Sequence, residues 1–338
     1  MRAYLETPTK IYLQITNTCS LNCRQCYTRC EGGCAPTDLT TSEWLTLADK
    51  LFESGIMHVY FEGGEPLSRP DFIHIAEYFS RKALVWMRTH ATTLTPDIAF
   101  KLSDARVSLV SVDIFSDNAA EHDFLSGVVG SFNRTLEGIS NLIHAGIDVV
   151  LICIVNAISI RRLQGVVNLA STLGVGKVGL FRLYPLGRAR ENWLELSVSP
   201  RHATKAIAEL NVPIDIKVMQ SWHPNNGNCC WENAGITSDG RSIGCPYLRE
   251  YVDFGNIREI SFLETWQHPL YKRLRSGPVQ SGACGECASR EGRAGGCRAA
   301  AYAFHRDWSA HDPYCEFMGN NVDITQITEF PGHSESSR

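Results

Sequence analysis

The sequence predicts an α/β protein, a partial (β/α)6 barrel followed by a small cysteine-rich domain. Short apolar runs alternate with amphipathic stretches through the first 215 residues, which is typical of βαβ units and a parallel sheet. Beyond that point Cys, Gly and Arg become frequent and long apolar periodicity ends. Of the 13 cysteines, five lie between residues 19 and 34 and seven between 229 and 315, so each part of the chain has one clump, and Cys153 stands alone.

The apolar runs predict six strands, over 11–16, 58–61, 83–88, 107–112, 149–155 and 177–183. Helical patterns lie between them, over 42–53, 71–81, 96–103, 132–144 and 161–172. Six units are too few for a closed eight-stranded barrel, so we expect an open, curved one with its site at the carboxyl ends of the strands. We expect the barrel domain over 1–215, the cysteine-rich domain over 216–320 and a tail over 321–338 that is disordered from residue 325.

Charge and hydropathy exclude several classes of protein. The chain has 338 residues with 32 Lys and Arg against 36 Asp and Glu, a net charge of −4, which argues against an electrostatic nucleic-acid binder. The longest apolar run, 149–155, is far shorter than the roughly 20 residues of a membrane span. The N-terminus has no apolar signal region. We therefore expect a cytoplasmic protein without nucleic-acid or membrane partners.

The first clump of cysteines indicates metal chemistry. An odd number of cysteines without an export signal disfavours a disulfide framework. Cys19, Cys23 and Cys26 follow the first predicted strand as C-x3-C-x2-C. Three thiolates can bind three irons of a four-iron cluster and leave the fourth iron open. A zinc site is the alternative, with Cys30 or Cys34 as a fourth ligand.

A second motif follows the second predicted strand, where residues 61–66 read FEGGEP. Glycines let the backbone approach a ligand closely, and a carboxylate can bind an ammonium group. With CSLNCRQCY at 19–27, this motif resembles the radical S-adenosylmethionine (SAM) enzymes. The resemblance implies a [4Fe-4S] cluster on Cys19, Cys23 and Cys26 whose open iron binds SAM. It also implies that Gly63, Gly64 and Glu65 hold the SAM amino group.

The same resemblance implies further contacts to SAM. Tyr27 follows the third cysteine, Ser111 and Asp113 are expected near the ribose and carboxylate, and Asn156 and Leu183 near the adenine. Capping or turn formation is the alternative for Ser111 and Asp113. The implied reaction begins with an electron from a donor such as flavodoxin or ferredoxin. Cleavage of SAM then yields a 5′-deoxyadenosyl radical that abstracts a substrate hydrogen, with no side chain assigned as catalytic.

The second clump resembles the SPASM or twitch extension of that family, which carries one or two auxiliary iron–sulfur clusters. The resemblance implies Cys230, Cys245 and Cys297 as ligands of a first auxiliary cluster, with Cys229 as a possible fourth ligand, and Cys284, Cys287 and Cys315 as ligands of a second. Arg293 stands where the family pattern has a further cysteine, and a guanidinium is a very poor iron ligand. We expect the second cluster to persist with a contact other than Cys. A zinc ribbon is the alternative.

The substrate is the least specified feature. Arg88 and Arg182 end predicted strands, where a guanidinium could bind a substrate carboxylate, the SAM carboxylate or a neighbouring acid. His90 either contacts substrate or is structural. The first predicted strand starts by residue 11, so we expect no peptide-recognition domain before the barrel. The expected substrate is a small polar natural-product precursor (a sugar acid, nucleoside or aminocyclitol) that is decarboxylated or dehydrogenated. The alternatives are a maturase of a ribosomally made peptide and a non-catalytic iron–sulfur or zinc scaffold.

Overall fold

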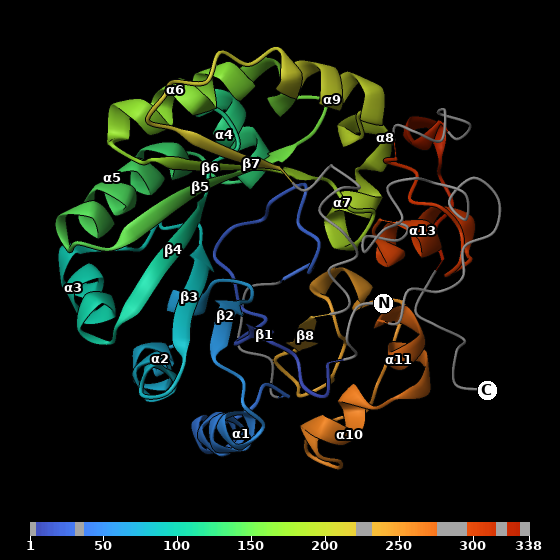
Figure 1. The fold of residues 1–338 in the computed structure, drawn as a ribbon. Helices are drawn as coiled ribbons and strands as arrows, with labels where there is room; N and C mark the ends of the chain where they lie inside the picture. Colours follow the sequence, from blue (N-terminus) through green and yellow to red (C-terminus); the bar gives the residue numbers. More distant parts are fainter. Residues whose placement is uncertain (1–4, 31–36, 221–231, 276–295, 316–322, 332–338) are drawn as a thin grey trace.

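An eight-stranded, all-parallel sheet forms the centre of the computed structural model, which describes residues 5–30, 37–220, 232–275, 296–315 and 323–331. The strands lie in the order β7-β6-β5-β4-β3-β2-β1-β8. Their bounds are β1 Lys10–Gln14, β2 His58–Glu62, β3 Leu84–Thr89, β4 Val107–Asp113, β5 Asp148–Val155, β6 Lys177–Arg182, β7 Lys217–Gln220 and β8 Asn233–Ile236. Among the described strands no pairing joins β7 to β8, so the curved sheet is an open barrel (Figure 1).

Helices cover the outer face of this sheet (Figure 1). Those of the barrel are α1 Thr41–Glu53, α2 Phe72–Ser80, α3 Pro96–Asp104, α4 Ala119–Ser126, α5 Ser131–His144, α6 Leu163–Leu173, α7 Gly187–Glu191, α8 Trp193–Leu196 and α9 Pro200–Ala208. The C-terminal part contains α10 Phe262–Trp266, α11 Pro269–Arg275 and α13 Arg298–His305, which lie beyond β8 and α7. None of the described helices has the length and apolarity that a membrane crossing requires.

Alternation along each strand decides which side chains face the helices. Ile11 and Leu13 of β1 are fully buried in the layer between sheet and helices, whereas Tyr12 faces the barrel interior. Local signals fix where helices begin. A capping box of Thr40 and Glu43 starts α1. Thr95 caps α3, whose first residue is Pro96.

The predicted fold class is confirmed, and the six predicted strands and five predicted helices are all present within a few residues. The sheet has two further strands, β7 and β8, which have four residues each and carry little apolar pattern. Both come from the segment assigned to the second domain, since the predicted boundary at residue 215 precedes β7. The short helix α4 was also missed.

Part of the predicted disordered tail packs on the barrel. Ile324 is fully buried, and its carbonyl accepts a hydrogen bond of 2.6 Å from the indole N–H of Trp193. The Phe330 ring lies 5.5 Å from the same indole. The prediction of a disordered tail is therefore wrong for 325–331, because the apolar side chains of Ile324 and Phe330 anchor this segment to Trp193.

Candidate active site

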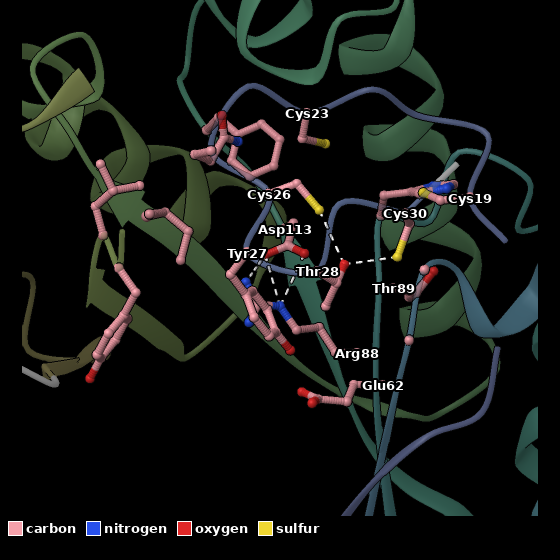
Figure 2. Close-up of a pocket in the computed structure, with 18 of the residues that line it drawn as sticks. Cys19, Cys23, Cys26, Tyr27, Thr28, Cys30, Glu62, Arg88, Thr89 and Asp113 are labelled. Carbon is pink, nitrogen blue, oxygen red and sulfur yellow. Dashed lines mark hydrogen bonds and ion pairs between the residues drawn. The ribbon is translucent and has the colours of Figure 1, made fainter. Parts of the chain in front are cut away.

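A cavity lies at the carboxyl ends of the strands, and we call it the upper chamber (Figure 2). Its walls come from the loop after β1, the ends of β2 to β6 and the segment near residue 247. The side chains and glycines that matter here are Cys19, Cys23, Cys26, Tyr27, Cys30, Glu62, Gly63, Gly64, Arg88, His90, Asp113, Arg182, Leu183, Tyr184 and Tyr247. The structure thus brings the three predicted cluster ligands and the glycine motif to one cavity.

Backbone contacts from α4 hold the cysteine loop in place. The N–H groups of Asn22 and Arg24 donate to the carbonyls of Ser126 and Leu125, at 3.0 and 2.8 Å. These two bonds lie on either side of Cys23, so its backbone position is set by α4.

Helix α7 holds the other side of the loop. The Arg188 guanidinium donates to the carbonyls of Cys23 and Cys30, at 3.0 Å each. Gly187 has a φ of +52°, and a Cβ there would lie 2.7 Å from the Cys26 carbonyl oxygen. Only glycine lets the start of α7 approach the loop this closely.

The glycine motif is joined to the same loop. The N–H of Gly64 donates to the Thr16 carbonyl at 2.8 Å, and the N–H of Glu65 to the Thr18 carbonyl at 2.7 Å. A Cβ on Gly64 would lie 2.1 Å from the Thr18 oxygen. Glycine is therefore required here by the packing of two turns, in addition to any contact with a ligand.

The Glu65 carboxylate faces the protein. It is fully buried and accepts hydrogen bonds from the Thr89 hydroxyl at 2.8 Å, the His90 N–H at 2.9 Å and the Leu67 N–H at 3.0 Å. These bonds tie the glycine motif to the end of β3. The geometry therefore gives Glu65 a positioning task, and the predicted contact with the SAM amino group rests on Gly63 and Gly64, which line the chamber.

His90 bridges the cysteine loop and Glu65. Its Nδ1 accepts a hydrogen bond of 3.1 Å from the Thr92 N–H, so the proton of the neutral ring is on Nε2. Nε2 lies 3.2 Å from the Ser20 hydroxyl and 3.3 Å from a Glu65 oxygen. Because the ring is buried among these partners, the structural role left open for His90 is the one that its contacts support.

Both predicted carboxylate-binding arginines contact acids of the chain. Arg88 binds Asp113 through Nε and Nη2, at 2.6 to 3.1 Å. Arg182 binds Asp312 at 2.9 and 3.0 Å, and this pair is almost fully buried. A neighbouring acid was one of the alternatives for each arginine, and a substrate carboxylate would have to displace it. Substrate binding by Arg88 or Arg182 stays a prediction.

The Arg182–Asp312 pair joins the barrel to the C-terminal part. Asp312 also accepts hydrogen bonds from the N–H groups of Cys297 and Tyr314, at 2.8 and 3.0 Å. The Tyr184 hydroxyl, which accepts from Arg182, lies 3.5 Å from the Cys297 sulfur. A predicted auxiliary ligand is thereby placed next to the wall of the upper chamber.

The thiols of the loop fit a multi-iron cluster. Burial raises the pKa of Cys19 to about 12, whereas a hydrogen bond from Cys30 holds the pKa of Cys26 well below its ordinary value. Among the described residues no three His, Cys, Asp or Glu side chains converge as ligands of one metal ion do. Cys19, Cys23 and Cys26 line one cavity instead. Ligation to the iron cations of a cluster would supply the positive charge that these buried thiolates need.

Cys30 also lines this chamber, and the Thr28 hydroxyl links it to Cys26, with sulfur distances of 2.8 and 3.2 Å (Figure 2). The geometry therefore leaves a fourth thiol beside the predicted three. Cys34, the other possible fourth ligand, lies outside the described residues.

The remaining predicted SAM contacts divide between two places. Tyr27, Asp113 and Leu183 line the upper chamber. Ser111 faces the interior of the barrel below it. The Asn156 side chain instead caps a turn, accepting from the N–H groups of Ile158 and Ser159 at 2.9 and 3.0 Å.

Of the predicted auxiliary ligands, Cys245 and Cys297 are buried and Cys315 is half-buried. Cys297 occupies the N-cap position of α13 without a side-chain capping bond, and Asp312 packs against Gly296, whose φ is +67°. Cys229, Cys230, Cys284, Cys287 and Arg293 lie outside the described residues. The auxiliary ligand sets stay predictions.

A second cavity fills the barrel interior below the first, and we call it the lower chamber. It has a free volume of about 430 Å³ and is lined by residues of all eight strands. Glu62, Arg88 and Tyr247 line both chambers. Sequence reasoning missed Glu62, Tyr184 and Tyr247, although Glu62 had a signal: Tyr60 and Glu62 alternate with buried Val59 and Phe61 along β2.

Comparison with known proteins agrees with this geometry. The model of the radical SAM superfamily matches residues 13–170, and that of the SPASM iron–sulfur cluster-binding domain matches residues 229–288. The AdoMet-dependent heme synthase of Methanosarcina barkeri is 31% identical over 93% of this chain and 98% of its own length. The PqqA peptide cyclase of Methylocella silvestris is 24% identical over 98% of this chain and 93% of its own.

Among solved structures, the chain is similar to Streptococcus suis SuiB bound to precursor peptide SuiA, with a TM-score of 0.74 and 14% identity. The match covers 96% of this chain and 77% of SuiB. At this identity the likeness shows the shared fold.

These findings correct the expected substrate. The relatives are named as a heme synthase and a peptide cyclase, so the prediction of a small polar natural-product precursor is wrong. The cyclase aligns over most of its length, which removes the argument from a missing peptide-recognition domain. The apolar walls of the lower chamber also do not suit a sugar acid or an aminocyclitol.

The matches extend over both parts of the chain and agree with the cysteine loop, the glycine motif and the barrel. The chain is an enzyme, and its cofactors are SAM, a [4Fe-4S] cluster and auxiliary iron–sulfur clusters. With a relative of 31% identity along almost its whole length, the chain belongs to the radical SAM superfamily and carries a C-terminal SPASM domain.

Proposed function

We propose that this enzyme is a maturase that modifies a ribosomally made peptide. The observation that carries the proposal is a polar groove beside the upper chamber, lined by residues that include Asn17, Thr28, Arg29, Thr237 and Ser238. Thr28 lines both the groove and the upper chamber. An extended segment lying in the groove would therefore pass the entrance to the cysteine loop.

The chemistry of the groove suits a peptide backbone. Its described lining has four arginines and four acids, and three ion pairs join them: Arg29–Glu191, Arg190–Glu250 and Arg241–Asp239. A balanced surface of this kind favours a neutral polar chain over a polyanion. Hydroxyl and amide side chains next to these pairs can donate to backbone carbonyls and accept from N–H groups. The relative named as a peptide cyclase supports the same substrate class.

The chain's own residues would prepare the reaction. We propose that Cys19, Cys23 and Cys26 hold the cluster and that Gly63 and Gly64 present backbone groups to SAM. The bound cofactors supply abstraction of a substrate hydrogen atom. Buried Glu65 and His90 keep the two loops in register, and the stacked rings of Tyr184 and Tyr247, 3.7 Å apart, close one side of the chamber against water.

A second candidate function is a step in heme formation. The match to the relative named as a heme synthase covers 98% of that relative's length. The lower chamber is large and apolar. Heme and its tetrapyrrole precursors are flat, apolar rings with carboxylate arms. Such a ring needs an apolar chamber more than it needs the polar groove.

One experiment decides between these functions. The reconstituted enzyme is reduced with SAM and offered perdeuterated candidate peptides encoded beside its gene or a deuterated porphyrin with propionate arms. Deuterium in 5′-deoxyadenosine is measured by mass spectrometry. Transfer from a peptide supports the maturase, whereas transfer from the porphyrin alone would replace it by the second function.

A further inference from the structure

The lower chamber is built on a row of aromatic rings that no cofactor motif explains. Tyr12, Tyr60 and Trp86 are register partners on β1, β2 and β3. The rings of Tyr12 and Tyr60 lie 5.2 Å apart, and those of Tyr60 and Trp86 lie 6.4 Å apart. Rings at these distances present one continuous aromatic wall.

The adjoining wall is mostly aliphatic. Leu109, Val150 and Ile152 form a separate buried cluster on β4 and β5, and Trp86, Phe181 and Met219 pack against it. Trp86 is the register partner of Leu109, so the two walls meet where β3 pairs with β4. Together they line the lower chamber, which still has a free volume of about 430 Å³. A well-packed core does not leave a space of this size between apolar walls, so the chamber has the character of a ligand site.

The two ends of the chamber are polar and differ in charge. Lys10, Lys177 and Lys217, the first residues of β1, β6 and β7, line its end at the amino termini of the strands. Lys10 lies over the Tyr12 ring at 4.6 Å, and Lys177 is 3.8 Å from Asp148, whose side chain is largely exposed. Lys177 and Lys217 alone place two ammonium groups against one described acid, so this end is cationic.

The other end meets the upper chamber at Glu62. This side chain is 7% exposed, lies in the walls of both chambers and has the Tyr27 hydroxyl as a hydrogen-bond partner. Arg88, beside it, is engaged by Asp113. A carboxyl oxygen of Glu62 can therefore accept a hydrogen bond from a group that enters the shared space.

We propose that the lower chamber binds the apolar end of the substrate, an aromatic ring system that carries a carboxylate. The ring lies against the adjoining aromatic and aliphatic walls, and the carboxylate points to the lysines. A hydrogen-bond donor on the same group binds the Glu62 carboxylate. This contact places the adjoining part of the substrate next to the upper chamber. This assignment depends on the proposed function in one respect, which is that the ligand of the lower chamber is taken to be the enzyme's substrate. An aromatic residue at the end of a peptide and a tetrapyrrole share this chemistry.

The test uses two probes of equal shape, 2-naphthoate and 2-naphthamide, titrated into the cluster-loaded enzyme with SAM. Both should bind, and naphthoate should bind up to about fivefold more tightly, since an ion pair at a partly exposed end is worth up to about 1 kcal/mol. Naphthoate should also quench tryptophan fluorescence, and Trp86→Phe should remove that part of the signal because its ring lines the chamber.

Two kinds of variant locate the probe. Ile152→Trp fills the chamber and should weaken both probes at least tenfold, whereas Ile214→Trp makes the same change at an exposed loop position and should alter neither. Lys217 is exposed at the rim of the lower chamber, so the Lys217→Glu variant is expected to fold normally. It should abolish the preference for naphthoate and spare naphthamide, and Lys205→Glu on α9 is its matched control.

Competition then identifies the source of the ring. A peptide ending in tyrosine and a dicarboxylic porphyrin are each tested for displacement of naphthoate. Displacement of naphthoate by either competitor supports the subsite and shows which class of substrate supplies the ring. This result does not depend on turnover. Equal binding of the two naphthyl probes would overturn the anionic specificity. Unchanged binding in Ile152→Trp, or displacement by neither competitor, would overturn the substrate subsite even if deuterium transfer from a peptide succeeds.

Discussion

The two chambers of the barrel interior are built on opposite principles. In the upper chamber the charged side chains other than Glu62 are paired within the chain, and turns from three parts of the sequence are tied together by hydrogen bonds. In the lower chamber aromatic and aliphatic side chains surround free volume, and charges stand only at its ends. A preorganised polar frame suits a cofactor that is the same throughout a family, whereas an apolar space can change its ligand by changing single side chains.

The largest expected effect breaks the upper chamber at its cluster. Cys23→Ala should reduce formation of 5′-deoxyadenosine below detection after reduction, because two thiolates cannot hold the site-differentiated cluster. Chromatography of the reaction mixture measures it. Cys153→Ala is the matched control, since Cys153 is buried on the outer face of β5 and should lose stability only. Full SAM cleavage by Cys23→Ala would mean that the loop does not ligate the cluster.

The buried ion pair between barrel and SPASM domain should have the next largest effect. Asp312→Asn leaves the Arg182 guanidinium buried without its counter-charge, which should cost about 3–5 kcal/mol of unfolding free energy. Glu191→Gln removes one member of the exposed Arg29–Glu191 pair and should cost less than about 1 kcal/mol. Chemical denaturation of the cluster-loaded enzyme compares the two, and equal losses would show that burial does not strengthen the pair.

A third prediction separates positioning from direct SAM contact. Glu65→Gln keeps the shape of the side chain but weakens hydrogen bonds that are charge-assisted, each worth roughly 1.5–3 kcal/mol. We expect SAM affinity and unfolding free energy to fall together, because the carboxylate holds the glycine turn from behind. Calorimetric titration and denaturation measure the two quantities. A loss of affinity at unchanged stability would instead place Glu65 against SAM itself.

The sequence predicted the cofactor-binding residues of the site better than it predicted the partners of the charged residues. Cys19, Cys23, Cys26, Gly63 and Gly64 could be found because close spacing along the chain fixes their chemistry and backbone shape. The pairing of Arg182 with Asp312 could not be found, since the two residues are 130 positions apart and meet only through the packing of two domains. Motifs therefore identified the cofactor chemistry, while the partners of the charged residues required the fold.

The sequence predicts the lower chamber less clearly than it predicts the cofactor site. Tyr12, Tyr60 and Trp86 occupy alternate positions in strands whose other residues are buried under helices, so their parity predicts an inward-facing set. Parity alone cannot tell a filled barrel core from an open chamber, because that depends on residues of all eight strands. Strands β7 and β8, which complete the lining, are too short and too polar to be recognised.

The smallest expected effect concerns the carboxyl group at which the chambers meet. Burial raises the pKa of Glu62, whereas a hydrogen bond from Arg258 on the surface lowers the pKa of Glu43 to about 2. A raised pKa means that ionisation opposes folding. The free energy of unfolding of the wild type should therefore decline relative to that of Glu62→Gln as the pH rises above 4.5, the ordinary value for this group.

Glu43→Gln should show the opposite sign. The ionised Glu43 stabilises the fold above 4.5 and loses that contribution as the pH falls toward 2, so the variant should be less stable than the wild type at neutral pH and match it in acid. Denaturation curves of the three proteins at pH 2, 4, 6 and 8 measure both differences. A Glu62→Gln variant that is less stable than the wild type at pH 8 would mean that a cation of the protein holds the Glu62 carboxylate. The chamber boundary would then belong to the paired, polar frame above it, and the Glu62 oxygens would be engaged by the protein in place of a substrate donor.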